Sequence, residues 1–198
     1  MKALHKNILE RLDQIINNTG DHIHDFINNP HAFTRKRTLD AATVLKTTIN
    51  MQGQNLNSEL FRAFGEDATK KNDKVVSTSA YVQRKSQLSP ACFKHILTVF
   101  NQNLFNIQLF DHHYRLFAID GSDFNQIWNP KSNNIVQASS HKKKPYCQIH
   151  VNALYDLLNN TYQDCIFQPK SEMDERKAAV QMLKALNCGP YIVTMDRG

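Results

Sequence analysis

The sequence has little glycine and proline and contains no long apolar run. Each of the two residues occurs six times in 198 residues, too few for a low-complexity or linker protein. No stretch approaches the roughly 18 apolar residues that a membrane-spanning helix needs. Charged and apolar side chains alternate at the start of the chain, which therefore lacks the continuous apolar segment of a secretory signal. We expect a folded, cytoplasmic protein that does not span a membrane.

The sequence also lacks the spacings that typify zinc sites. Its cysteines are scattered and form no CxxC pair: Cys92, Cys147, Cys165 and Cys188. Two close pairs of histidines have no third ligand at a recognisable spacing: His22 with His24, and His112 with His113. We expect buried or unreactive thiols and exposed or capping histidines.

Positive charge exceeds negative charge along the chain. There are 24 Lys and Arg residues against 18 Asp and Glu, a formal net charge of +6. Such a balance favours contact with polyanions such as nucleic acids, although many basic proteins bind none.

Residues 1–110 are predicted to form a helical, DNA-binding region. Apolar residues recur at helical spacing at the start of the chain, and the pattern stops at the polar run from Asn17 to Gly20. This predicts a helix end with Gly20 as the C-capping residue. Two further helical segments follow, and we expect Gly53 and Gly65 to close them.

Two helices with a short connection are predicted near the end of this region. One runs from about Ser79 to Lys85, and Ser89 followed by Pro90 marks the start of the next, as N-cap and first-turn proline. The pair resembles a helix-turn-helix, in which Arg84 and Lys85 would contact DNA phosphates. An ordinary helical hairpin with a solvated basic end fits the spacing equally well.

From Tyr114 onward the pattern is that of strands. The apolar run Tyr114–Ile119 predicts a strand buried on both faces, with Asp120 directly after it. Alternation over Cys147–Ala153, a turn at Asn159–Asn160 and a returning segment that ends at Pro169 predict a hairpin.

The segment between these strands, up to about Pro145, is predicted to be a loop. Its basic run of Lys142, Lys143 and Lys144 would track a DNA backbone, while a solvated loop is the commoner meaning of such a run. Trp128 is expected to pack in the core or the hairpin rather than to stack on bases.

A crossover helix and a last strand complete the pattern. Ser171 and Asp174 have capping-box spacing, with Asp in place of Glu or Gln, and Gly189 closes the helix. The apolar run Tyr191–Met195 predicts a strand, and Asp196 follows it. Residues 111–198 therefore have the order β-β-β-α-β, and the fold class is α/β.

This order predicts that Asp120 and Asp196 meet. In an antiparallel meander followed by a right-handed crossover, the fourth strand lies beside the first and parallel to it, about 4.8 Å away. Two carboxylates so close need a shared proton or a divalent cation, and oxygen ligands favour Mg²⁺ or Mn²⁺. Paired ions would support phosphoryl chemistry. Aspartates also cap strands and begin turns, and that alternative stays open.

Several segments resemble DDE transposases of bacterial insertion sequences, in the class with a C-terminal signature of spaced Tyr, Arg, Glu and Lys. They are SAYVQRKSQLSPACFKHI, FAIDGSDFN around Asp120, IHVNALYDLLNNTYQDCIFQP from Ile149, the ERKA run at Glu175, and IVTMDRG. They follow the order of the family and cover the chain from about Ser77 to Gly198.

The resemblance implies an incomplete ribonuclease-H-like domain. Asp120 and Asp196 match the first and second catalytic aspartates, each a metal ligand, and the complete enzyme would use two Mg²⁺ or Mn²⁺ ions. The complete enzyme would cut double-stranded DNA at transposon ends, free a 3′ hydroxyl and join it to target DNA. The resemblance is also compatible with a homodimer of the complete enzyme. Asp123 has no family role, and we expect it to cap a turn.

The chain also departs from the family. The third carboxylate, a Glu on a later helix, follows the second aspartate in the family, whereas this sequence ends two residues after Asp196. We expect a truncated transposase that lacks a complete active site and cleaves negligibly. The alternatives are a non-catalytic DNA-binding remnant that occupies transposon ends and a decayed product without a role.

Overall fold

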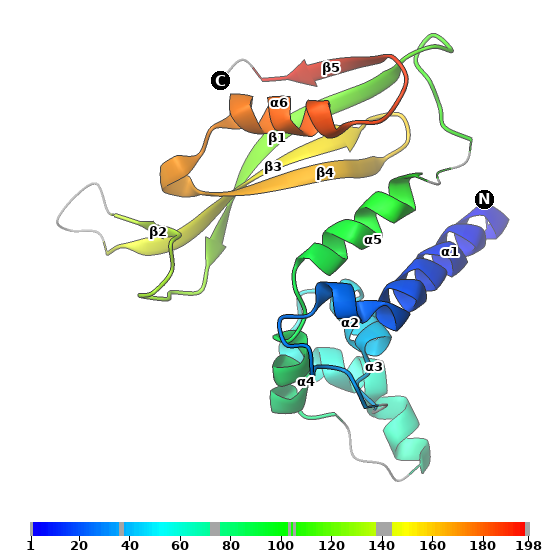
Figure 1. Ribbon diagram of the computed structural model, residues 1–198, viewed down its shortest axis with the longest axis vertical. Helices are drawn as coiled ribbons and strands as arrows, with labels where there is room; N and C mark the ends of the chain where they lie inside the picture. Colours follow the sequence, from blue (N-terminus) through cyan, green and yellow to red (C-terminus); the bar gives the residue numbers. More distant parts are fainter. Residues whose placement is uncertain are drawn as a thin grey trace. The chain divides into compact units, whose positions relative to one another are not determined.

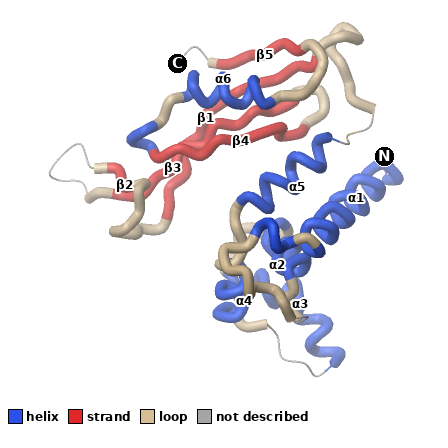
Figure 2. The backbone as a smooth tube through the Cα atoms, viewed as in Figure 1, coloured by secondary structure: helices blue, strands red, loops and turns tan. Residues whose placement is uncertain are grey.

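The chain folds as two compact units, Met1–Phe100 and Asn101–Gly198. The computed structural model describes residues 2–35, 38–71, 76–102, 104, 106–137 and 144–196. The first unit is built from helices, and the second from a mixed sheet with a helix on it (Figure 1, Figure 2). Within the described ranges, every helix is too short or too polar to cross a membrane.

The helical unit has a continuous apolar core. Its elements are α1 (Lys2–Asp21), η1 (Ile23–Phe26), α2 (Ala41–Ile49), α3 (Leu56–Lys71), α4 (Thr78–Lys85) and α5 (Ala91–Gln102). All of these elements contribute buried side chains to the core. Val44, Leu45, Leu60, Tyr81 and Cys92 are among its fully buried side chains.

Two glycines predicted to end helices lie within them. Helix α1 continues to Asp21, and α3 continues past Gly65 to Lys71. A Cβ on Gly20 would lie 2.7 Å from the Cβ of Ala42, so Gly20 allows close packing of α1 against α2 instead of capping. Gly53, in the turn after α2, has a φ of 78°, the left-handed region that glycine adopts without strain.

The predicted start of α5 at Ser89 is confirmed, and α4 begins at Thr78, one residue before the predicted Ser79. The Ser77 hydroxyl accepts a hydrogen bond from the Ala80 N–H at 3.3 Å, at the N-terminus of α4. The Ser89 hydroxyl accepts one from the Ala91 N–H, also at 3.3 Å, where α5 begins. Both serines thus satisfy donors that a helix start leaves without a partner.

The second unit holds a curled mixed sheet. Strand β3 lies between β1 and β4 and is antiparallel to both, while β5 lies parallel to β1 on its other side. The meander and the crossover agree with the sequence prediction, and β2, which pairs with the start of β3, is an addition within the predicted loop. The strands are β1 (Arg115–Gln126), β2 (Ile135–Val136), β3 (Tyr146–Asp156), β4 (Thr161–Pro169) and β5 (Tyr191–Met195).

Strand β1 is longer than predicted. It was expected to end at Ile119, yet its pairing with β3 continues from Gly121 opposite Asn152 to Gln126 opposite Cys147. This ladder keeps the polar segment after Ile119 extended. Asp120 therefore lies inside β1 and not beyond its end.

Helix α6 (Glu175–Ala185) covers one face of the sheet (Figure 1). Its Ala179 and Met182 pack against Phe117 and Leu154 of the strands. The N-cap is Asp174, whose carboxylate accepts from the Lys177 N–H at 2.9 Å. The predicted cap at Ser171 is wrong, because that residue lies in a separate 3-10 turn, η2 (Lys170–Glu172).

Candidate functional site

The strand register brings Asp120 and Asp196 to adjacent positions. The last paired residues of β1 and β5 are Ile119 and Met195, and the two aspartates follow them directly. Paired residues of parallel strands share a face, so Asp120 lies on the face of Ala118 and Thr194, and Asp196 is the first residue past the end of β5. Both are exposed.

Asp120 borders a groove of about 570 Å³ on the sheet face opposite α6. The groove is lined by alternate residues of β1 and β3, and Phe124, Tyr155 and Tyr162 form its aromatic walls. The Asp120 Oδ1 atom accepts a hydrogen bond from the Gly121 N–H at 2.9 Å, which orients the carboxylate. An acidic group thus lies at the margin of an aromatic groove.

The donor set of this pair fits a hard divalent cation. Mg²⁺ is usually bound by one or two carboxylates together with water and substrate phosphates, and two adjacent aspartates supply that number. Among the described residues, no three His, Cys, Asp or Glu side chains lie close enough together to hold a metal ion.

A charged cluster, which we call the Asp123 corner, lies on the other face of β1. Asp123 Oδ1 is 2.7 Å from Nδ1 of the buried His150, and Asp123 Oδ2 is 2.6 Å from Lys170 Nζ. The other ring nitrogen of His150 is 3.2 Å from Glu175 Oε1, at the start of α6. The turn-capping role predicted for Asp123 is wrong, because β1 continues through this residue.

The Asp123 corner packs directly on Gly121. A Cβ there would lie 2.6 Å from His150 Nε2 and 2.7 Å from Glu175 Oε1. The Lys170 ammonium, and secondarily the His150 ring, hold the pKa of Asp123 below its ordinary value. The cluster fixes the start of α6 against β1, one residue from Asp120. The sequence did not predict the Asp123 corner. The available signal was His150, in a predicted strand in which apolar and polar residues alternate.

The predicted DNA-binding residues differ in their surroundings. Arg84 is half-buried: its guanidinium lies 4.6 Å from the centre of the Phe33 ring and donates to Gln87 Oε1 at 3.1 Å. Lys85 and Lys144 are exposed. Lys142 and Lys143 lie outside the described residues.

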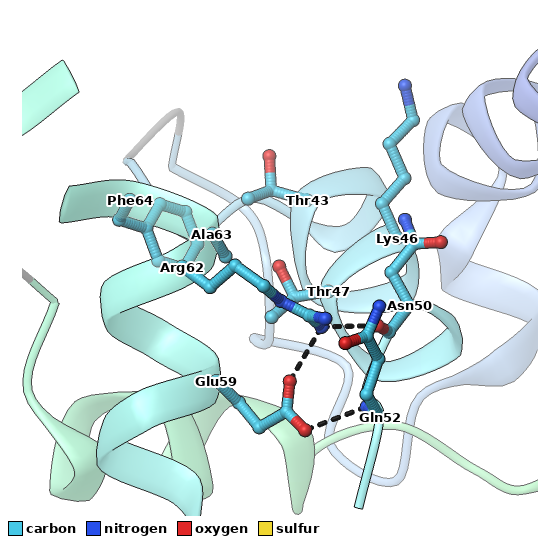
Figure 3. Close-up of a pocket in the computed structure, with 9 residues that line it drawn as sticks. All are labelled: Thr43, Lys46, Thr47, Asn50, Gln52, Glu59, Arg62, Ala63 and Phe64. Carbon is cyan, nitrogen blue, oxygen red and sulfur yellow. Dashed lines mark hydrogen bonds and ion pairs between the residues drawn. The ribbon is translucent and has the colours of Figure 1, made fainter. Parts of the chain in front are cut away.

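A polar pocket of about 480 Å³ lies between α2 and α3 of the helical unit (Figure 3). The buried Glu59 carboxylate accepts from the N–H groups of Gln52 and Gln54 at 2.7 and 2.9 Å, and it pairs with Arg62 at 2.6 Å. Hydrogen bonding from Gln54 is the main cause of a lowered pKa of Glu59. Arg62 also donates to the Asn50 carbonyl. The hydrogen-bonding groups of Glu59 and Arg62 are thus used within the protein. We interpret the pocket as structural: it holds the loop after α2 against α3.

Comparison with known protein families, curated proteins and solved structures finds no match to this chain.

Proposed function

We propose that this chain is part of a DDE transposase in which Asp120 and Asp196 supply two metal-binding carboxylates. The observation that carries the proposal is that each aspartate directly follows the last paired residue of the parallel strands β1 and β5, although the two lie far apart in sequence. The resemblance of the surrounding segments and the positive net charge support the same conclusion, since the substrate would be a DNA phosphodiester.

The two aspartates would hold Mg²⁺ or Mn²⁺ at the end of the β1–β5 ladder. A divalent ion bound there would polarise a phosphodiester and stabilise the charge that develops during in-line displacement. The contribution of the chain would be positional: the ladder would bring the two carboxylates near each other, and the Gly121 N–H orients that of Asp120. The aromatic groove beside Asp120 offers a surface for a nucleotide.

Only two of the three carboxylates that the resemblance implies are identified in this chain. No further acidic or histidine ligand joins the pair in the part that the structure describes. We therefore expect metal binding that is measurable but weak, and negligible strand cleavage by these 198 residues.

Binding of Mn²⁺ tests the proposal. It is measured as the decrease of the electron paramagnetic resonance signal of the free ion. Asp120→Asn and Asp196→Asn should each weaken binding about tenfold or more, because each removes a charged ligand. Glu172→Gln is the matched control, since it removes an exposed carboxylate of the same unit. Unchanged Mn²⁺ affinity in both aspartate variants would refute the proposed site.

A second candidate function is that of a non-catalytic DNA-binding protein that occupies transposon ends. The exposed Lys85 in the last turn of α4 favours it. DNA binding that weakens in Lys85→Ala, by a chain that shows no binding of Mn²⁺ at Asp120 and Asp196, would separate it from the enzyme.

A further inference from the structure

Strands β1 and β3 continue beyond the part of the sheet that β4 and β5 reach. Strand β5 pairs with β1 only as far as Ile119, and β4 pairs with β3 only back to Ile149. Beyond these points the ends of β1 and β3 pair with each other, and β3 also pairs with β2. We call residues 124–137 and 144–148 the β-extension; Figure 1 shows it around β2, at the opposite end of β3 from the turn into β4.

The β-extension exposes several large apolar side chains. The exposed fraction is 94% for Ile127, 55% for Phe124, 50% for Trp128 and 44% for Tyr146. The expectation that Trp128 packs in the core or the hairpin is therefore not met. A concentration of exposed aromatic and aliphatic groups on a short element marks an interaction surface.

The charge of the same segment is entirely positive. From Phe124 to Tyr155 the sequence contains no Asp or Glu and four lysines. Of these, Lys131 and Lys144 are described, and both are exposed. Lysine is depleted at the core of protein–protein interfaces, whereas lysines beside exposed aromatic rings are typical of surfaces that bind nucleic acid strands.

The β-extension is also continuous with the groove beside Asp120. Phe124 and Asp120 line this groove from the same face of β1, four residues apart, which corresponds to about 13 Å along a strand. A nucleic acid strand whose phosphate lies at Asp120 and which follows β1 would reach the aromatic residues of the β-extension.

We propose that the β-extension binds single-stranded DNA, with bases stacked on Trp128 and Phe124 and phosphates neutralised by Lys131 and Lys144. Ile127 would contact a neighbouring base, since an exposed aliphatic side chain can pack against the face of an unstacked base. Stacking is tolerant of sequence because every base has a π-face. The inference rests on the proposed function for DNA as the substrate class, but not on metal binding.

Trp128 is the single tryptophan of the chain, so its fluorescence reports on the β-extension directly. Titration with oligodeoxythymidylate of about 12 nucleotides should quench the emission saturably, and added salt should weaken binding. The double variant Lys131→Ala, Lys144→Ala should bind about tenfold more weakly. Lys184→Ala, on α6, removes an exposed lysine outside the β-extension and should bind normally.

The aromatic contribution is measured separately, by fluorescence anisotropy of a labelled oligonucleotide. Trp128→Ala should weaken binding about tenfold, whereas Trp128→Phe should keep most of the affinity because it keeps an aromatic face. Circular dichroism of each variant shows whether the fold is intact. A blunt duplex of the same length should bind more weakly than the single strand, because its bases are already stacked.

Several outcomes would overturn the proposal: no quenching, quenching that is indifferent to the lysine and tryptophan substitutions, or equal affinity for duplex and single strand. A change of Trp128 emission with protein concentration alone, together with dimers in sedimentation, would assign the surface to a second copy of the chain. The double variant Asp120→Asn, Asp196→Asn should bind the oligonucleotide normally, so failure of the metal site and failure of the β-extension are distinguishable.

Discussion

Gly121 separates the two charged features of β1. The residue before it is Asp120, on the groove face, and His150 and Glu175 pack against Gly121 itself on the α6 face. A side chain at this position would enter the Asp123 corner. The glycine is therefore required by close approach and not by a turn.

Gly121→Ala tests this interpretation. The added Cβ would overlap the His150 ring, which is buried and held by Asp123, so we expect a loss of about 1–3 kcal/mol in the free energy of unfolding. Gly189→Ala is the control, because a Cβ there meets nothing within 4 Å, and its effect should be neutral or stabilising by up to about 1 kcal/mol. Urea denaturation measures both, and equal stability of the two variants would contradict the packing argument.

The sequence located the two aspartates of the candidate site because each directly follows a short apolar run. It did not locate the partners of Asp123. The residues of that corner come from β1, β3, η2 and α6, and no local pattern records which side chains meet when four elements pack together. Asp123 was consequently assigned to a turn that does not exist.

At the scale of elements, α6 is attached to the sheet in two ways. Its apolar face packs on the strands through Ala179 and Met182. Its start is held by charge, since Glu175 faces His150 while Lys170, in the preceding η2, pairs with Asp123. The charged attachment depends on pH.

Acid should weaken this attachment. The pKa of Asp123 is lowered in the folded protein, mainly by Lys170. Its stabilising contribution is therefore complete above the ordinary carboxyl pKa of about 4 and is lost as the pH falls through the lowered value. Asp123→Asn should lower the melting temperature at neutral pH and flatten the decline of stability in acid, as measured by thermal unfolding from about pH 2 to 7. Glu172→Gln should retain the wild-type profile, and an unchanged profile in Asp123→Asn would show that the pair contributes nothing.

The errors in element prediction share a physical cause. Gly20 lies within α1 because its close packing against Ala42 of α2 outweighs the modest cost of glycine in a helix, about 1 kcal/mol relative to alanine. The polar residues after Ile119 form strand because β3 supplies their backbone partners. The prediction that Ser89 starts a helix succeeded, because it depends on a hydrogen bond to a residue only two positions away.

At the scale of the whole molecule, the positive charge and the proposed two-carboxylate site predict that the chain binds DNA without cleaving it. The chain should bind plasmid DNA with an affinity that falls steeply as salt rises, because bound lysines and arginines release counterions. It should not nick supercoiled plasmid in Mg²⁺ or Mn²⁺. Gel electrophoresis of the plasmid measures both properties, and robust nicking that Asp120→Asn abolishes would show that two carboxylates suffice.

The sequence by itself determined the order of the main helices and strands, the start of α5, the excess of positive charge and the presence of an aspartate after each of two apolar runs. These depend on backbone hydrogen bonding and hydrophobic spacing within short segments. Only the tertiary structure decided the length of β1, the Asp123 corner, the reason for Gly20 and Gly121, and the exposure of Trp128. Each of these depends on which distant residues occupy the neighbouring space, and packing between elements settles that.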